Sequence, residues 1–212
     1  MKAKVKASDH VALGSIALSI VSSVALYGSL PARVPTHFDL HGNANGFMTR
    51  PAGAFLLPAI AVAIWALLRF GGRILPGDWR ARFAASPTGL VAAMLSVLMS
   101  ALHVVVLYAA THPGESVGVV LGVVLGASWI ALGLVLPRVR RNPWVGVRTP
   151  WTLSSDENWA ATHRFAGTVF VASGLVAVAG AWLLSPMVSF LAIVASAVIA
   201  SIYSFVLAHR VS

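Results

Sequence analysis

Six long apolar segments alternate with polar ones along the chain. They run over residues 11–30, 53–70, 88–111, 117–136, 166–184 and 188–208. Each has roughly 18–24 residues, the length that a helix needs to cross a hydrocarbon layer about 30 Å thick. The only Asp, Glu, Lys or Arg residue inside them is Arg69, at the edge of the second segment. The pattern predicts an all-α integral membrane protein with a six-helix transmembrane bundle.

The composition supports this class. The chain is 58% hydrophobic and only 10% charged, with a mean hydropathy of +0.84. A soluble domain carries about 25% charged residues, and so little polar material cannot cover the surface of a soluble fold. The chain has no cysteine, which excludes disulfides, thiolate catalysis and zinc–sulfur sites. The first apolar segment precedes bulky Leu30 and Pro31 rather than a small-residue cleavage site, so we expect a retained span.

The basic residues predict an orientation. If the N-terminus lies inside, all but two of the 15 lysines and arginines lie on the inner side, the exceptions being Arg33 and Arg50. Loops on the cytoplasmic side are enriched in such residues. We therefore expect both termini in the cytoplasm and the protein in the cell membrane as a multi-pass protein. The net charge of +9 reflects this topology, and because the cations fall between the apolar segments we expect no nucleic-acid partner.

Two polar segments are too long and too patterned to be simple connectors. The first polar segment, residues 31–52, is expected to form a structured outer loop. The second polar segment, residues 137–165, is expected to form a structured cytoplasmic loop. No internal repeat or linker divides the chain, so we expect residues 1–212 to form a single membrane domain.

Within the spans, two features stand out. Gly118, Gly122 and Gly126 recur every four residues and line one helix face. Small residues at that spacing allow close helix packing, either within the chain or in a homodimer. His103 is the only ionisable residue deep in a span. Such residues are functional candidates, although a neutral histidine bonded to a neighbouring serine is the alternative interpretation.

The first polar segment contains the run "VPTHFDLHGNANGF", residues 34–47. His37, Asp39 and His41 project to one side of an extended chain and are a candidate site for a divalent metal. The alternatives are a loop held together by hydrogen bonds, with Gly and Asn in its tight turns, and a surface for an external ligand. The candidate ligand-binding residues are His37, Phe38, Asp39, His41, Gly42, Asn43, Asn45 and Gly46.

The second polar segment has clustered tryptophans and a helix-start signal. Ser154 and Glu157 match a capping box, so a helix should begin near Ser155 and continue into the fifth span. Along it, Trp159, His163 and Gly167 share one face. Pro150 disfavours helix at Thr149, which predicts an extended turn there. The segment is either an interfacial anchor or a folded cytoplasmic patch that binds a partner or closes the bundle. We expect no catalysis, because Asp156 and Glu157 do not face each other.

Both polar segments resemble the SdpI-type immunity proteins, which protect against the sporulation-delaying peptide toxin. The first matches the family pattern at Pro35, His37, Phe38, Gly42 and Gly46, with Asp39 where Asn is usual and Asn45 where Asp is usual. The second matches over a longer and more specific run, whose matching residues are Asn142, Gly146, Arg148, Thr149, Pro150, Trp151, Thr152, Leu153, Trp159, Thr162, His163, Arg164 and Gly167.

The resemblance implies a non-enzymatic membrane protein that shields its cell from a membrane-active peptide toxin bound at the outer face. It also implies a receptor that holds a cytoplasmic repressor at the membrane, with the inner residues from Asn142 to Arg164 as the partner-binding or structural site. The alternatives are a small-solute transporter or channel, and a metal-dependent enzyme using His37, Asp39 and His41. Apart from that metal, we expect no cofactor.

Overall fold

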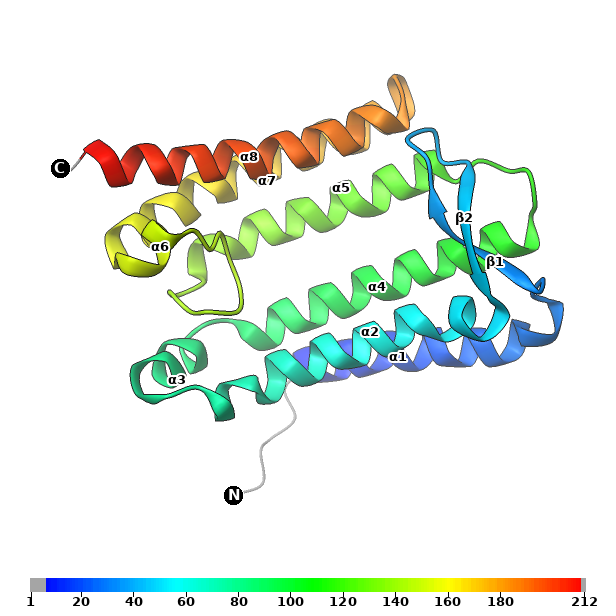
Figure 1. Cartoon of the computed structure of the whole chain (residues 1–212), viewed down its shortest axis with the longest axis horizontal. Coiled ribbons are helices and arrows are strands. Elements are labelled where there is room, and N and C mark those ends of the chain that lie inside the picture. The colour runs from blue at the N-terminus through cyan, green and yellow to red at the C-terminus, as the bar shows by residue number, and fades with distance from the viewer. Residues whose placement is uncertain (1–6, 211–212) are drawn as a thin grey trace.

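Six long helices run roughly parallel through the molecule (Figure 1). The computed structural model describes residues 7–210, with the side chains of residues 7–209. The long helices are α1 (Ala7–Leu26), α2 (Arg50–Phe70), α4 (Thr88–Thr111), α5 (Gly118–Val135), α7 (Asp156–Leu183) and α8 (Pro186–Arg210). All six are long and apolar enough to cross a membrane, which confirms the predicted six-helix membrane fold.

The predicted span boundaries agree with these helices to within about four residues, with one exception. Helix α7 begins at Asp156, ten residues before the fifth apolar segment, because a capped polar turn precedes the apolar part. The expected helix start near Ser155 and its continuation into the fifth span are therefore confirmed. The N-cap is Ser155, whose hydroxyl accepts from the Asn158 N–H at 3.1 Å. The predicted Ser154–Glu157 capping box was therefore wrong by one residue.

The helices form two layers (Figure 1). One layer contains α1, α2 and α4, and the other contains α5, α7 and α8; α4 and α5 lie side by side and join them. The glycine face of α5 lies inside the second layer. A Cβ atom at Gly122 would meet Ser189 and Ala181, and one at Gly126 would meet Gly174 and Val178. Because this face is covered by the same chain, the structure favours internal packing over the homodimer alternative for Gly118, Gly122 and Gly126.

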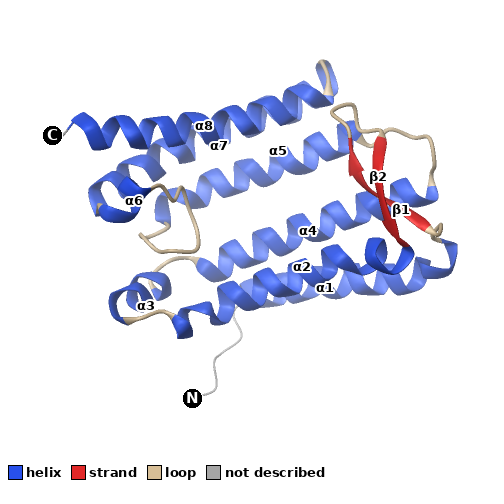
Figure 2. Cartoon of the chain, in the orientation of Figure 1, coloured by secondary structure: helices blue, strands red, loops and turns tan. Residues whose placement is uncertain are grey.

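The first polar segment forms a β-hairpin rather than a loop without regular structure. Strand β1 (Arg33–Phe38) pairs antiparallel with β2 (Ala44–Thr49) (Figure 2). The register of this pair is irregular on both sides of His37. Val34 anchors the hairpin, because it is fully buried against Leu30 and Ala54. Phe38 packs against two hydrophobic clusters, and both of them include buried residues of α4.

The hairpin and the second polar segment lie at opposite ends of the bundle (Figure 1). The short helices α3 (Gly77–Ala84) and α6 (Pro150–Ser154) lie at the end where α1 begins and α8 ends. We call this the α3 end, and the other the hairpin end. The two segments singled out by sequence are therefore separated by the full length of the bundle.

Two buried polar contacts stabilise the first layer. Nε2 of His103 lies 2.7 Å from the hydroxyl oxygen of Ser23 on α1, so the histidine is bonded to a neighbouring serine, as the alternative interpretation expected. Near the α3 end, buried Asp9 accepts from the Arg69 guanidinium at 3.2 Å and the Trp65 indole at 3.3 Å. This ion pair accounts for the single arginine inside a predicted span.

Candidate functional site

Asp39 organises the turn that closes the hairpin. Its Oδ1 atom accepts backbone hydrogen bonds from His41 at 2.8 Å and Asn43 at 2.9 Å. Aspartate favours such turns because its short side chain reaches the backbone two residues further on. The N–H group of Asn43, together with that of His41, lowers the pKa of the Asp39 carboxyl below its usual value. The turn therefore contains an ionised carboxylate at neutral pH.

The turn is attached to the start of α5. The carbonyl of Gly42 accepts from the Val117 N–H at 3.1 Å, and the carbonyl of His41 accepts from the Ser116 hydroxyl at 2.7 Å. Gly42 has a φ of 83°, and a Cβ atom there would collide with the backbone of Gly118. Glycine is therefore required at position 42 both for its backbone conformation and for the close contact with α5.

The three candidate metal ligands do not come together. Nδ1 of His37 donates to Oδ1 of Asn45 on the opposite strand, the Asp39 carboxylate faces the turn, and the His41 side chain is exposed. Within residues 7–210, no three His, Asp or Glu side chains are placed to hold a metal ion. The residues present do not fit a metal site. They fit the alternative in which hydrogen bonds hold this segment together.

A pocket opens between the hairpin and helices α5 and α8. This hairpin pocket has a volume of about 460 Å³. Five of the eight predicted ligand-binding residues line it, namely His37, Phe38, Asp39, Gly42 and Asn45. The opposite wall is mainly apolar and comes from the helices, including Leu121, Leu125 and Phe190. His41, Asn43 and Gly46 do not line the pocket. They belong to the hairpin's own structure, since a Cβ atom at Gly46 would lie 2.7 Å from that of His37.

At the α3 end, Asn142 organises the start of the second polar segment. It is fully buried, and its Oδ1 atom accepts from the N–H groups of Trp144 and Val145, both at 2.8 Å. Its Nδ2 atom donates to the carbonyls of Arg140 at 2.8 Å and Val145 at 3.1 Å. A buried amide with both ends satisfied fixes one loop conformation, because any other would leave polar groups unpaired.

His163 and Trp159 form the floor under this loop. Nδ1 of His163 bonds the carbonyl of Trp159 at 2.8 Å, and Nε2 faces the N–H of Val147 at 3.2 Å. Since a carbonyl only accepts and a backbone N–H only donates, the imidazole is neutral with its proton on Nδ1. Gly146 lies directly above, with a φ of 123°, and a Cβ atom there would collide with both rings. The predicted shared face of Trp159, His163 and Gly167 is therefore a buried packing surface.

A short capped helix follows the loop. Thr149 is extended, as Pro150 predicts, and forms a reciprocal capping box with Thr152 at the start of α6. The indole Nε1 of Trp151 donates to the Ser204 hydroxyl on α8 at 2.6 Å, and Nδ2 of Asn158 donates to the Ser204 carbonyl at 2.9 Å. Ser204 therefore links α6, α7 and α8. Sequence reasoning missed it because a single serine inside an apolar span gives no distinguishing signal.

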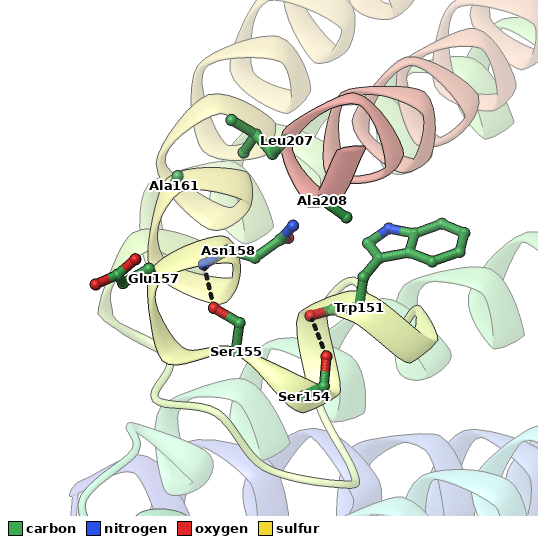
Figure 3. A pocket seen from close by; sticks show the side chains of 8 residues that line it. All are labelled: Trp151, Ser154, Ser155, Glu157, Asn158, Ala161, Leu207 and Ala208. Carbon is green, nitrogen blue, oxygen red and sulfur yellow. Dashed lines mark hydrogen bonds between the residues drawn. The ribbon is translucent and has the colours of Figure 1, made fainter. Parts of the chain in front are cut away.

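A pocket of about 440 Å³ lies beside α6, between the start of α7 and the end of α8 (Figure 3). Asn158 points toward the indole ring of Trp151, Ser154 and Ser155 add hydroxyl groups, and Glu157 lines the pocket with its carboxylate turned away from the other residues. We call it the α6 pocket. Of the other predicted inner residues, Arg148 donates to the Pro143 carbonyl at 2.7 Å, and Arg164 is exposed on α7.

The comparisons with known proteins agree with this division of the chain. Residues 138–208 match the model of the SdpI/YfhL protein family, and residues 14–62 match a domain of unknown function, DUF1648. The chain is 25% identical over 165 residues to the immunity protein SdpI of Bacillus subtilis (strain 168). The aligned region covers 76% of this chain and 75% of that protein. No solved structure matches. These matches confirm the resemblance that the two polar segments indicated: the chain is similar to the SdpI-type immunity proteins, and its six long apolar helices are those of a multi-pass membrane protein.

Proposed function

We propose that this protein is an immunity protein of the cell membrane that protects its cell by binding a membrane-active peptide in the hairpin pocket. The observation that carries the proposal is the lining of that pocket. The polar turn residues, including His37 and Asp39, face an apolar wall formed by Leu121, Leu125 and Phe190. A peptide with one cationic and one apolar side would contact both surfaces at once.

The charge of Asp39 supports a cationic ligand. A carboxylate has about four positions that can accept hydrogen bonds. The turn uses three of these, with the N–H groups of His41 and Asn43 and, at 3.3 Å, the side-chain amide of Asn43. Capacity for a ligand cation therefore remains. Glu115, the other carboxylate at the hairpin end, accepts from the Tyr108 hydroxyl and does not line the pocket.

Protection also requires the hairpin to face outward, and labelling tests this directly. The chain has no cysteine, so single thiols can be introduced at Asn43 in the hairpin turn and at Ser155 at the α3 end. We expect an impermeant maleimide added to intact cells to label the thiol at position 43 and not the one at 155. The opposite pattern would exclude binding of an external peptide in this pocket.

The functional test is the sensitivity of cells to peptides that their own community secretes. We expect deletion to increase sensitivity to a cationic, apolar fraction of these peptides, and the intact gene to restore resistance. Asp39→Asn should restore much less, because it keeps an oxygen for the turn but removes the charge. Glu115→Gln is the matched control and should restore resistance fully. Equal resistance with and without the protein would contradict the proposal.

The α3 end offers a second part to this function. We propose that the second polar segment binds a cytoplasmic repressor, with the α6 pocket beside Trp151 as the contact. Coupling between the two ends requires that the peptide prefer one of two arrangements of the helices. Co-purification of the protein with a repressor, with and without peptide, tests this separately from resistance.

A further inference from the structure

A second cleft at the α3 end is not used by the proposed function. It has a volume of about 850 Å³ and lies between α3, the segment 137–141 and the start of α7. Four arginines line it: Arg82, Arg138, Arg140 and Arg141. Its only acidic lining residues are Asp78 and Asp156. We call it the arginine cleft, and it has an excess of positive charge.

Two of the arginines already share one carboxylate. Arg82 and Arg141 both donate to Asp156, the latter from Nε at 2.7 Å. The hydrogen bond that Arg82 donates to Asp156 raises the pKa of Arg82 above its usual value. Asp156 is thus used within the protein and does not neutralise the remaining pair of cations, Arg138 and Arg140.

Arg138 and Arg140 are exposed and available to a ligand. The Arg138 guanidinium donates only to the carbonyl of Leu134, at 3.3 Å, in the preceding helical turn. The guanidinium of Arg140 has no hydrogen-bond or ion-pair partner within residues 7–209. Each arginine carries five N–H donors, so most donors of this pair are free for an anion.

The backbone of the cleft is nevertheless fixed. The Ser86 hydroxyl accepts from the Arg140 N–H at 3.1 Å and lies 3.3 Å from the Arg140 carbonyl. Arg141 also bonds the carbonyl of Leu153, and its guanidinium lies 5.5 Å from the centre of the Trp79 ring. The walls of the cleft are therefore held in place by the fold. Residues of α3 and of the turn that follows it contact residues of the second layer there.

The position of the cleft relative to the apolar spans fits that of lipid head groups. Helix α4 begins at Thr88 and α5 ends at Val135, so the cleft is just beyond the apolar spans. Trp79 and Trp159 lie beside it, and tryptophan is enriched at the boundary between membrane and water. Basic pockets at that level bind anionic head groups.

We propose that the arginine cleft binds the phosphate of an anionic phospholipid head group, with Arg138 and Arg140 as its principal donors. The acyl chains of the lipid would extend along the apolar helices, while the head group joins α3 to the segment 137–141. A bound lipid would therefore strengthen the contact between the two helix layers. This site depends neither on the peptide pocket nor on which end of the bundle faces the cytoplasm.

The test measures lipid binding to the purified full chain in detergent. Native mass spectrometry would count bound lipids, and thermal unfolding would report stability, with phosphatidylglycerol or phosphatidylcholine added at equal concentration. We expect phosphatidylglycerol to bind preferentially and to raise the unfolding temperature. The double substitution Arg138→Gln/Arg140→Gln should weaken its binding by about tenfold or more, because each basic residue contributes to attraction for anionic lipid. Arg164→Gln, an exposed arginine at the same end outside the cleft, is the matched control and should bind like the wild type.

Each other outcome overturns the site. Equal binding of both lipids, or unchanged phosphatidylglycerol binding by the double variant, would exclude recognition by these arginines. If inorganic phosphate alone gave the full stabilisation, the ligand would be a free anion and not a lipid. If an acidic protein raised the unfolding temperature and phosphatidylglycerol did not, the cleft would be a protein-binding surface. Since Arg138 and Arg140 make few contacts, the double variant should unfold without lipid at the wild-type temperature, which separates loss of binding from loss of the fold.

Discussion

The imidazole of His163 lies nearly parallel to the indole of Trp159, with ring centroids 4.0 Å apart and an interplanar angle of 18°. The two rings come from successive turns of α7, and Gly146 lies directly on them. Neither ring can move without disturbing the loop above, because Val147 bonds His163 and Trp159 donates to the Val139 carbonyl at 2.8 Å. The ring pair therefore sets the position of the loop from 139 to 147.

Gly146→Ala tests this contact. The new methyl group would collide with both rings, and the φ of 123° is unfavourable for alanine. We expect a loss of roughly 1–3 kcal/mol in the free energy of unfolding from the backbone strain, with more from the collision. Circular dichroism during denaturant titration in detergent would measure it. Gly114→Ala is the matched control, since Gly114 also has a positive φ, 91°, but open space around it. A loss no larger than that of the control would show that the rings can yield.

The spans could be predicted because the membrane imposes a simple local rule. A helix must stay apolar over about 20 residues to cross the bilayer, and this can be recognised without knowing its neighbours. The apolar run 88–111 coincides with α4 for that reason. The hairpin was not predicted, because strand pairing joins residues up to 16 positions apart, such as Arg33 and Thr49, and Pro35 and Gly46 interrupt any strand pattern. The turn of the hairpin was easier to predict, because Asp and Asn favour tight turns through bonds to residues near them in sequence.

The candidate sites were predicted in the same uneven way. The shared face of Trp159 and His163 follows from helical spacing, which the sequence displays directly. The link between Arg82 and Asp156 joins residues 74 positions apart, and nothing in the local sequence of either indicates the other. The hairpin pocket likewise depends on α8, whose Phe190 is distant in sequence from His37. Such sites require the packing of the helices to be known.

The turn of the hairpin should depend on pH through Asp39. Its pKa is lower in the folded protein than its usual value, so ionised Asp39 stabilises the turn above about pH 4, the pKa of an unfolded aspartate. This stabilisation should be lost as the pH falls through the lower, folded pKa. Hydrogen exchange over residues 36–47, corrected for the intrinsic rate, would show faster opening in that range. Asp39→Asn should remove the dependence, and an unchanged profile in that variant would assign it to another group.

The buried pair of Ser23 and His103 should behave as a coupled unit. Ser23→Ala leaves Nε2 of His103 without its hydroxyl partner in the apolar interior, which should cost about 1–3 kcal/mol. Removing both partners, in Ser23→Ala/His103→Leu, should cost less than the sum of the single substitutions. Unfolding free energies in mixed micelles would give the coupling. Ser15→Ala is the control, because the Ser15 hydroxyl bonds only the Ala12 carbonyl, at 2.9 Å. Additive losses would show that the two side chains act independently.

Trp151 offers a way to separate the stability of the α3 end from its contact with a partner. Trp151→Phe removes the indole donor to Ser204 at 2.6 Å, while a smaller ring can still contact Phe205. We expect a loss of about 1 kcal/mol in the free energy of unfolding, measured by denaturant titration, with the helical signal retained. Trp182→Phe should change stability little, since Trp182 is 72% exposed at the hairpin end. If Trp151→Phe folds with this small loss and no longer co-purifies with a repressor, the α6 pocket is the contact surface. If it unfolds outright, Trp151 is mainly structural and the partner must be sought elsewhere on the second polar segment.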